Sequence, residues 1–341
     1  MTNPAAPPLP PEAVMIQLAT SHWVARCIHV VAKLGVADQL KAGPKSAEDL
    51  AKAVGADASS LHRVLRALAS IGVFEQGKDR RYALTPLGDT LRTDAPGSAR
   101  PFAVYMAEPW HWNAYAELLH SVRTGQSAFP KVHGLPVFEW LERHPDASKT
   151  FNDAMVGFTQ TTGVAVLDAY DFAGIGTLVD VGGGVGHLLA AILAKYPKMK
   201  GVSFDLPSVN EEARKALAAA GLAKRATAEG GSFFEAVPAG DAHLLKHILH
   251  DWDDGRCLAV LRSCRKAVAA GGRLLVVEMV LPSDDSPSFG KVLDIEMLAV
   301  TEGGRERTEE EYRRLFASAG YELTRVIPTQ SPVFVLVGTP R

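Results

Sequence analysis

Histidines and carboxylates gather where one apolar run of the sequence ends. Residues 242–248 are predicted to form a buried strand that leads into the turn His-Asp-Trp-Asp-Asp at 250–254. His250 falls at the strand's carboxyl end, where open α/β sheets bind their ligands. An imidazole of ordinary pKa, about 6.5, is neutral near neutral pH and suits removal of a proton from a phenol of pKa about 10. We predict that His250 is a general base, with His243 and His247, which share a face of the strand, as competitors.

Glu278 is predicted to orient that base. It closes the apolar run 274–277, and a carboxylate in such a position is rarely left unpaired. A hydrogen bond to the second ring nitrogen of His250 would fix the tautomer and stabilise the imidazolium. The alternative for Glu278 is a buried acid satisfied elsewhere. For Asp251, next to the base, the alternative is a charge that caps the following helix.

A glycine cluster follows a second apolar run, Leu-Val-Asp-Val at 178–181. Gly182, Gly184 and Gly186 would let the backbone adopt turns closed to other residues and approach a ligand closely. The spacing D-x-G-x-G-x-G is not the dinucleotide fingerprint, which needs glycine at position 187 or 189. Asp205 ends the next strand, about where nucleotide-binding sheets place the acid that accepts the ribose hydroxyls. These residues predict a ribose-bearing cofactor; the alternative for the loop is a tight turn alone.

Six segments in combination resemble the small-molecule O-methyltransferases of the caffeate and acetylserotonin type, including their bacterial relatives. They are the glycine loop, Phe-Asp-Leu-Pro at 204–207, Gly-Ser-Phe-Phe at 231–234, the turn at 250–254, Glu278, and Gly-Gly-Arg-Glu-Arg-Thr at 303–308. The resemblance covers nearly the whole chain. It implies S-adenosylmethionine as cofactor and an α/β fold: a doubly wound Rossmann-like sheet of class I with an N-terminal all-helical winged-helix dimerisation domain.

The resemblance also assigns roles to single residues. Cofactor contacts fall to Asp180, Gly182, Gly184, Asp205, Leu206, Ser232, Phe233 and Lys246. Catalytic roles fall to His250, Glu278, Glu306 and Asp251, with Glu306 as the second orienting acid or, alternatively, a solvated loop residue. Many plant relatives carry aspartate where Ser232 stands, so a charged hydrogen bond to the adenine amino group would become a neutral one here.

The implied acceptor is a hydroxyl of a small aromatic or polyketide-like metabolite. Phe151 and Met155 lie four apart on one face of a predicted helix and match positions near the aromatic substrate in the family. A thioether against a ring is a favourable and adaptable contact. Trp110 is assigned to the same pocket, with a place in the helical core as an equal alternative.

The composition is that of an ordinary globular chain, with 341 residues, 47% hydrophobic and 22% charged, and a formal net charge of −2. This charge implies no global attraction to nucleic acid or anionic membranes. Cys27, Cys257 and Cys264 lack zinc-like spacing and are interpreted as reduced thiols. The proline-rich start at 4–11 lacks the features of a signal peptide, and no run has the length of a membrane span. We therefore expect a cytoplasmic protein without a metal, nucleic-acid or membrane partner.

Periodicity and the resemblance predict three parts. Residues 1–100 form the dimerisation domain, 101–170 are linking helices that contribute to the substrate pocket, and 171–341 form the catalytic domain. Strands at 177–181, 201–205, 242–248 and 273–279 alternate with helices, as in a doubly wound parallel sheet, and 321–327 and 333–337 should form an antiparallel pair that ends it.

The first helices and the module after them predict how the chain assembles. Residues 12–40 carry a broad apolar face, from Val14 to Leu34, that is too large for a lone surface helix and predicts a homodimer. Ser46 should cap one following helix and Asp57 or Ser59 the next, and 73–84 should form a two-stranded wing.

Other interpretations remain beside this one. A winged helix that carries Arg63, Arg66, Lys78, Arg80 and Arg81 could read DNA, although its helix offers few basic side chains for phosphate contacts. The acids of the 250–254 turn could hold magnesium in a metal-dependent mechanism. Some relatives keep the cofactor site but decarboxylate or hydroxylate, and the intact His250, Glu278 and Glu306 argue against such a change here.

Overall fold

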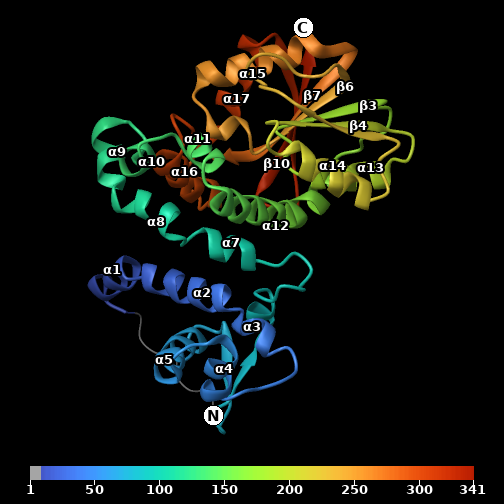
Figure 1. The fold of residues 1–341 in the computed structure, drawn as a ribbon. Helices are drawn as coiled ribbons and strands as arrows, with labels where there is room; N and C mark the ends of the chain where they lie inside the picture. The colour runs from blue at the N-terminus through green and yellow to red at the C-terminus, as the bar shows by residue number, and fades with distance from the viewer. Residues whose placement is uncertain (1–8) are drawn as a thin grey trace, which may run out of the picture. The chain divides into compact units, whose positions relative to one another are not determined.

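The strands predicted after residue 177 lie side by side in one sheet, as the computed structural model of the chain shows (Figure 1). The structure describes residues 9–341, apart from the side chains of residues 160 and 161, so most of the proline-rich start lies outside it. Contacts divide the chain into two units, Met1–Glu108 and Pro109–Arg341. The sheet belongs to the second unit.

The sheet runs in the order β5-β4-β3-β6-β7-β10-β9, with β8 paired to β7. Its strands are β3 Thr177–Val181, β4 Lys200–Asp205, β5 Ala226–Gly230, β6 Gly240–Lys246, β7 Val268–Leu281, β8 Arg307–Thr308, β9 Tyr321–Pro328 and β10 Val333–Pro340. Pairing is parallel from β5 to β7, and β10 is antiparallel to both β7 and β9. This confirms the doubly wound sheet and the antiparallel pair at its end.

Two predictions about strands need correction. β5 was not predicted, because the sequence Ala-Thr-Ala-Glu-Gly lacks the β-branched and aromatic run that marks a strand; pairing with β4 forms it. The strand predicted at 242–248 ends at Lys246. The chain turns there because His247 adopts a left-handed conformation with φ 53°.

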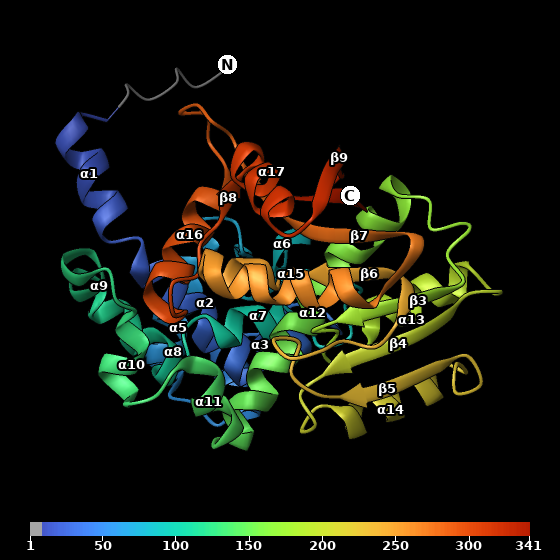
Figure 2. The same ribbon diagram turned by 90° about the horizontal axis from the view of Figure 1, so that it is seen from above.

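Helices cover both faces of the sheet (Figure 1 and Figure 2). One face packs on α12 Pro145–Ala169, α13 His187–Lys195 and α14 Asn210–Ala219, and the other on α15 Asp254–Ala267 and α17 Glu309–Ser318. Because neighbouring strand residues point to opposite faces, Leu275 and Val277 join the first core, whereas Leu274 and Val276 join the second.

A helical cluster precedes and flanks the sheet. It comprises α8 Pro109–Ala116, α9 Leu118–Thr124, α10 Ala128–His133, α11 Val137–Glu142 and α16 Phe289–Val300. Phe129 is fully buried in its core, with half-buried aromatic rings packed around it. Among the described residues, no helix combines the length and apolar character needed to cross a membrane.

The N-terminal unit is helical apart from its wing. Its elements are α1 Pro11–Ala19, α2 His22–Leu34, α3 Val36–Gln39, α4 Ala47–Val54, α5 Ala58–Ala69, β1 Phe74–Gln76, β2 Tyr82–Leu84, α6 Pro86–Asp89 and α7 Arg100–Tyr105. The predicted caps are confirmed: Ser46 accepts from the Asp49 amide, and Asp57 rather than Ser59 caps the next helix. β1 and β2 pair in antiparallel fashion as the predicted wing.

Candidate active site

The carboxyl ends of the parallel strands bring the predicted residues together. The glycine loop follows β3, Asp205 ends β4, Ser232 and Phe233 follow β5, Lys246 ends β6, and Glu278 is the residue after Val277, the partner of Lys246 on β7. Residues at the same edge of a parallel sheet form the crevice in which α/β proteins bind ligands.

The loop between β3 and α13 is held in a conformation that requires glycine. Gly182, Gly184 and Gly186 have φ of 71°, 54° and 78°. A Cβ on Gly182 would lie 2.3 Å from Ile248 Cδ1, so close packing also requires glycine there. A Cβ on Gly184 would meet no atom within 4 Å. The loop therefore borders open space in which a ligand could approach its backbone.

Asp205 ties this loop to β4. One carboxylate oxygen accepts from the Gly184 amide at 2.8 Å and the other from the Leu206 amide at 2.7 Å. A carboxylate oxygen has a second lone pair, so both could also accept from a ligand. Burial raises the pKa of Asp205, opposed by these two amides. The arrangement fits a carboxylate that binds a pair of hydroxyls.

The other predicted cofactor residues surround the loop at different depths. Asp180 is buried beneath it, where a Cβ on Gly183 would lie 2.9 Å from its Cγ, and burial raises the pKa of this carboxyl to about 7. The Phe233 ring approaches Gly182, where a Cβ would lie 3.8 Å from its edge. Burial lowers the pKa of Lys246. Leu206 is 37% exposed, and Ser232 is half-buried.

His250 lies in the short 3-10 helix η1, Leu249–Asp251, directly after β6. Its Nδ1 is 2.7 Å from Glu306 Oε1 and 3.7 Å from Glu278 Oε2, and its Nε2 is 3.7 Å from Asp251 Oδ1. This corrects the expectation that Glu278 makes the orienting hydrogen bond. Glu278 Oε1 instead accepts from the backbone amides of Ile248 and Leu249, at 3.0 and 2.9 Å, which holds the turn.

The three carboxylates change the proton affinity of His250. Burial of the imidazole lowers its pKa, but Glu278, Asp251 and Glu306 outweigh burial and raise it to about 10. Nearby acids in a poorly solvated site stabilise the imidazolium, so the neutral form of this ring is a stronger base than an ordinary imidazole. In its neutral form the ring accepts the proton of a phenol, pKa about 10, with little free-energy change.

The pKa values of the three acids around His250 shift in opposite directions. Burial acts against the charge of Glu278, but the imidazoles of His250 and His247 and the Ile248 amide lower its pKa to about 2. Burial raises the pKa of Asp251 to about 7 and also raises that of Glu306. Glu278 is thus the constant negative charge beside His250.

Within the described residues, neither competing histidine has a carboxylate as close as Glu306 is to His250, although His247 Nδ1 lies 3.6 Å from Glu278 Oε2. His243 is fully buried, its Nε2 lies 2.9 Å from the Pro238 carbonyl oxygen, and burial lowers its pKa. Burial also lowers the pKa of His247 to about 4, and its ring packs against Phe158 of α12 at 5.2 Å between centroids. Of the three, His250 combines an orienting acid with a pKa matched to a phenol.

The predicted acceptor residues fall into two environments. Met155 is half-buried on α12 three residues before Phe158, so the two share a helix face that meets the catalytic turn at His247. Phe151 contacts Phe138 edge to face at 6.3 Å.

Trp110 lies instead in the helical cluster. Its ring stacks on Trp140 at 5.4 Å and meets Phe129 edge-on at 6.4 Å. These contacts favour the core interpretation for Trp110.

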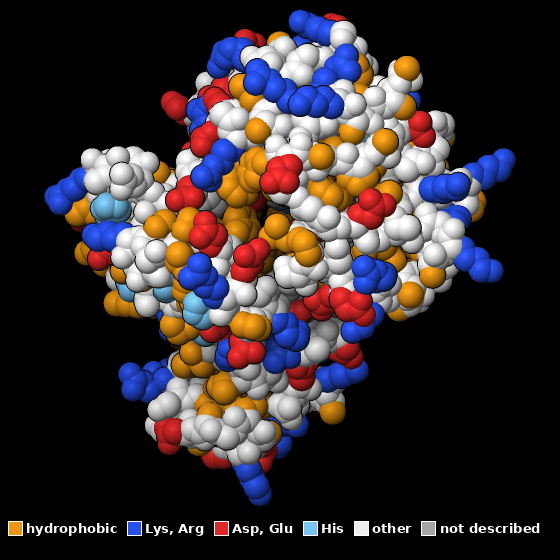
Figure 3. All heavy atoms as spheres, turned by 45° about the horizontal axis from the view of Figure 1, so that its top comes forward, with side chains coloured by type: hydrophobic (Ala, Val, Ile, Leu, Met, Phe, Trp, Pro, Cys, Tyr) orange, Lys and Arg blue, Asp and Glu red, His pale blue; other side chains and the backbone are white. Residues whose placement is uncertain are grey.

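A hollow of about 310 Å³ next to the base was not foreseen from the sequence. It is lined by Pro136, Val137, Phe138, Glu139, Phe234, Asp251, Trp252, Arg256 and Glu302. The Trp252 ring contacts Phe138 at 5.6 Å and Phe234 at 5.0 Å. On the face drawn in Figure 3, hydrophobic side chains surround a hollow with acidic side chains at its rim. In the sequence, Trp252 in the 250–254 turn and the pair Phe233-Phe234 were the features that could have indicated an aromatic pocket.

The remaining acids of the turn have structural partners. Asp253 Oδ1 accepts from the Arg256 amide at 2.9 Å and caps α15. Asp254 forms ion pairs with Arg305 and Arg307. Asp253 and Asp254 thus each bind a group of the protein itself.

Comparison with known proteins identifies the family. Residues 115–322 match the O-methyltransferase domain and residues 16–94 the O-methyltransferase dimerisation domain. The chain is 44% identical to a phenazine O-methyltransferase of Lysobacter antibioticus, over 99% of both chains, and 40% identical to a mitomycin biosynthesis 6-O-methyltransferase of Streptomyces lavendulae, over 93% of this chain and 91% of that one.

Comparison with a solved structure supports the same family. An O-methyltransferase from neocarzinostatin biosynthesis, crystallised with S-adenosylmethionine and 2-hydroxy-5-methyl naphthoic acid, superposes with a TM-score of 0.82 at 34% identity, covering 98% of this chain and all of that one. The chain belongs to this family of small-molecule O-methyltransferases, which use S-adenosylmethionine and carry an N-terminal dimerisation domain.

Proposed function

We propose that this enzyme methylates a hydroxyl of a small aromatic or polyketide-like metabolite of secondary metabolism, with His250 as the general base. The 2.7 Å contact between His250 Nδ1 and Glu306 carries the proposal, because it occupies Nδ1 and leaves Nε2 to take the acceptor's proton. Bound S-adenosylmethionine supplies an electrophilic methyl group on its sulfonium. The related phenazine and mitomycin enzymes support this substrate class.

The acceptor ring would lie against the aromatic wall beside the base. Phe138, Phe234 and Trp252 offer faces and edges for a planar ring, and Asp251 lines the same hollow next to His250. We assign Met155 and Phe151, from the linking segment 101–170, to the same pocket. Purified enzyme with labelled S-adenosylmethionine should methylate members of an aromatic hydroxyl library, and the absence of transfer to every member would contradict the proposal.

Asp205 is assigned to the ribose hydroxyls of the cofactor. Asp205→Ala should raise the dissociation constant of S-adenosylmethionine about 10- to 150-fold, since a hydrogen bond to a charged group contributes roughly 1.5–3 kcal/mol. Asp205→Asn, which keeps an acceptor oxygen, should fall between. Calorimetry measures both, with exposed Asp285→Ala as the control. An unchanged constant would leave Asp205 with only its role as anchor of the glycine loop.

The N-terminal helices support a homodimer. α1 buries none of its residues, and Met15, Ile16, Leu18 and Trp23 are each more than 60% exposed. Such a contiguous apolar surface marks an interaction site, and the dimerisation domain supports a second copy of the chain as its partner.

The double substitution Leu18→Glu and Trp23→Glu should shift the protein from dimer to monomer in sedimentation velocity, because it places charges in the proposed interface. It is a cleaner test than deletion of residues 1–40, which would also remove the core residues Val31 and Val36. Leu119→Glu with Val122→Glu, on exposed positions of α9, is the matched control. A monomeric wild type would refute the homodimer.

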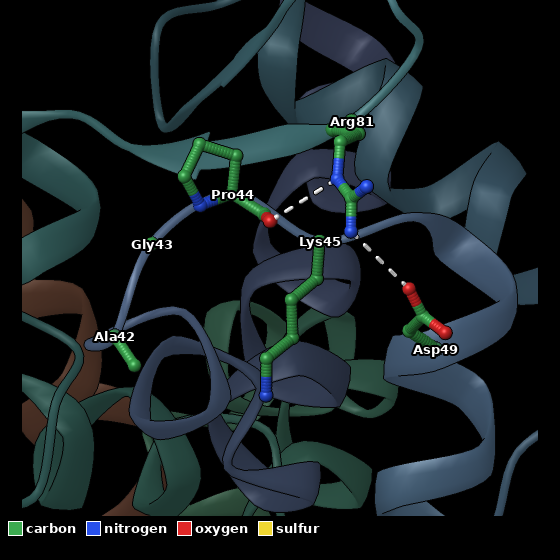
Figure 4. Close-up of a pocket in the computed structure, with 6 residues that line it drawn as sticks. All are labelled: Ala42, Gly43, Pro44, Lys45, Asp49 and Arg81. Carbon is green, nitrogen blue, oxygen red and sulfur yellow. Dashed lines mark hydrogen bonds and ion pairs between the residues drawn. The ribbon is translucent and has the colours of Figure 1, made fainter.

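DNA binding by the winged helix is the weaker alternative. A hollow of about 460 Å³ lies at the wing, and Figure 4 shows Lys45 and Arg81 in its lining. Arg81 donates to the Pro44 carbonyl at 3.2 Å and lies 3.5 Å from Asp49, so an acid already faces its charge. A salt-dependent mobility shift at near-physiological ionic strength would favour this alternative.

A further inference from the structure

A second imidazole beside the base has no evident role in methyl transfer. His247 has a left-handed backbone, and its side chain is only 8% exposed. Among the described residues, neither ring nitrogen has a hydrogen-bond partner within 3.5 Å, and Glu278 Oε2 lies 3.6 Å from Nδ1. Buried polar atoms usually have hydrogen-bond partners, so the nitrogens of this ring are available to bind a ligand.

An unsatisfied carboxylate oxygen faces the same point. Within the described part of the chain, Glu278 Oε2 has no hydrogen-bond partner within 3.5 Å; it lies 3.6 Å from His247 Nδ1 and 3.7 Å from His250 Nδ1. Ligand atoms of His247, His250 and Glu278 all lie within 4.8 Å of one another. The ligands of a tetrahedral zinc ion, at bonds of about 2.0–2.1 Å, are about 3.3 Å apart. Small side-chain shifts would therefore complete one face of such a site.

We propose that His247, His250 and Glu278 bind a divalent transition metal ion of the zinc class, and that its binding inhibits the enzyme. Two imidazoles and a carboxylate suit zinc, iron, cobalt or nickel, whereas magnesium and calcium prefer oxygen ligands. Glu306 can supply the fourth ligand, since its Oε1 adjoins His250 Nδ1 and its Oε2 has no partner among the described residues.

Inhibition follows from the chemistry of the shared imidazole. The metal forms a bond to Nδ1 of His250, the N–H bond at that atom breaks, and its proton leaves to water. Nε2, which is free in the active base, takes up one proton from water in exchange, so the ring becomes the neutral Nε2–H tautomer. With both nitrogens occupied, the ring cannot accept the proton of a phenol. Metal binding is independent of the proposed function, and only the inhibition rests on His250 as the base.

Chelator-treated full-length enzyme tests binding without cofactor or acceptor. Titration with Zn²⁺ in a calorimeter should give one site per chain, and Co²⁺ should give the absorption of a tetrahedral nitrogen and oxygen site. His247→Asn should weaken the affinity at least about tenfold, because it removes a ligand, while asparagine still tolerates the left-handed backbone. His120→Asn is the control. Equal affinity in His247→Asn, or a cobalt–thiolate spectrum, would overturn the site.

Activity tests the second half of the proposal. Zn²⁺ should abolish turnover of the wild type reversibly, with recovery on adding chelator, whereas the same concentration should leave His247→Asn at its own metal-free rate, whatever that rate is. Equal sensitivity of the two proteins would overturn the inhibition. Anomalous scattering from zinc-soaked wild-type crystals needs no variant: a peak bonded to the three ligands is expected, and its absence there would refute the site.

Discussion

Replacing His250 with alanine should lower turnover about 10²–10⁴-fold, the range typical of a positioned general base. The imidazole accepts the acceptor's proton through Nε2, and no other described histidine has both an orienting carboxylate at 2.7 Å and a pKa raised to about 10. Affinity for S-adenosylmethionine should hardly change, because its proposed contacts lie on the glycine loop and Asp205. Initial rates with labelled cofactor, paired with calorimetry, measure the two quantities separately.

The acidity of the acceptor separates a base from a residue that only positions the substrate. The loss caused by His250→Ala should shrink for phenols of lower pKa, which are partly ionised before they bind and need the base less. A purely positioning residue would show no such trend. His120→Ala serves as the control for histidine substitution. Near-normal turnover of His250→Ala on an unactivated phenol would mean that proximity to the sulfonium is the main catalyst.

The ends of the strands could be located from the sequence because a polar residue follows each apolar run there. Asp205 and Glu278 each end or interrupt such a run, and parallel strands carry their carboxyl ends to one edge, so their meeting at that edge follows from the fold class. The spacing of the glycines likewise predicted the loop that follows β3. These features depend on local pattern and topology alone.

Pairings across long sequence distances could not be predicted in the same way. Whether Glu278 or Glu306 bonds to His250 depends on the path of the turn, which the two amides bound by Glu278 and the positive φ of His247 determine. The same holds for the aromatic wall, where Phe138 of α11 meets Trp252 from a segment more than a hundred residues away. The pKa of His250 depends on three acids whose distances only the folded chain fixes.

Glu306→Gln should lower turnover by roughly 10²-fold or more, since the comparable change of acid to amide in a hydrolase triad costs about 10⁴-fold through the wrong imidazole tautomer. The Glu306 carboxylate holds the Nδ1 proton of His250, and an amide can turn its NH₂ group toward that nitrogen instead. Glu278→Gln should cost less, because Glu278 lies 3.7 Å away and acts on the ring through charge. Exposed Glu322→Gln is the matched control.

Double variants decide whether the acids act through the imidazole. If they do, His250→Ala combined with Glu306→Gln should lose little beyond His250→Ala alone, because effects within one catalytic unit are non-additive. Glu278 also holds the amides of Ile248 and Leu249, so thermal unfolding of Glu278→Gln must be measured; its amide oxygen can still accept from them. Losses that simply add would show that the acids act independently of the imidazole, and the role of Glu306 as its orienting group would be wrong.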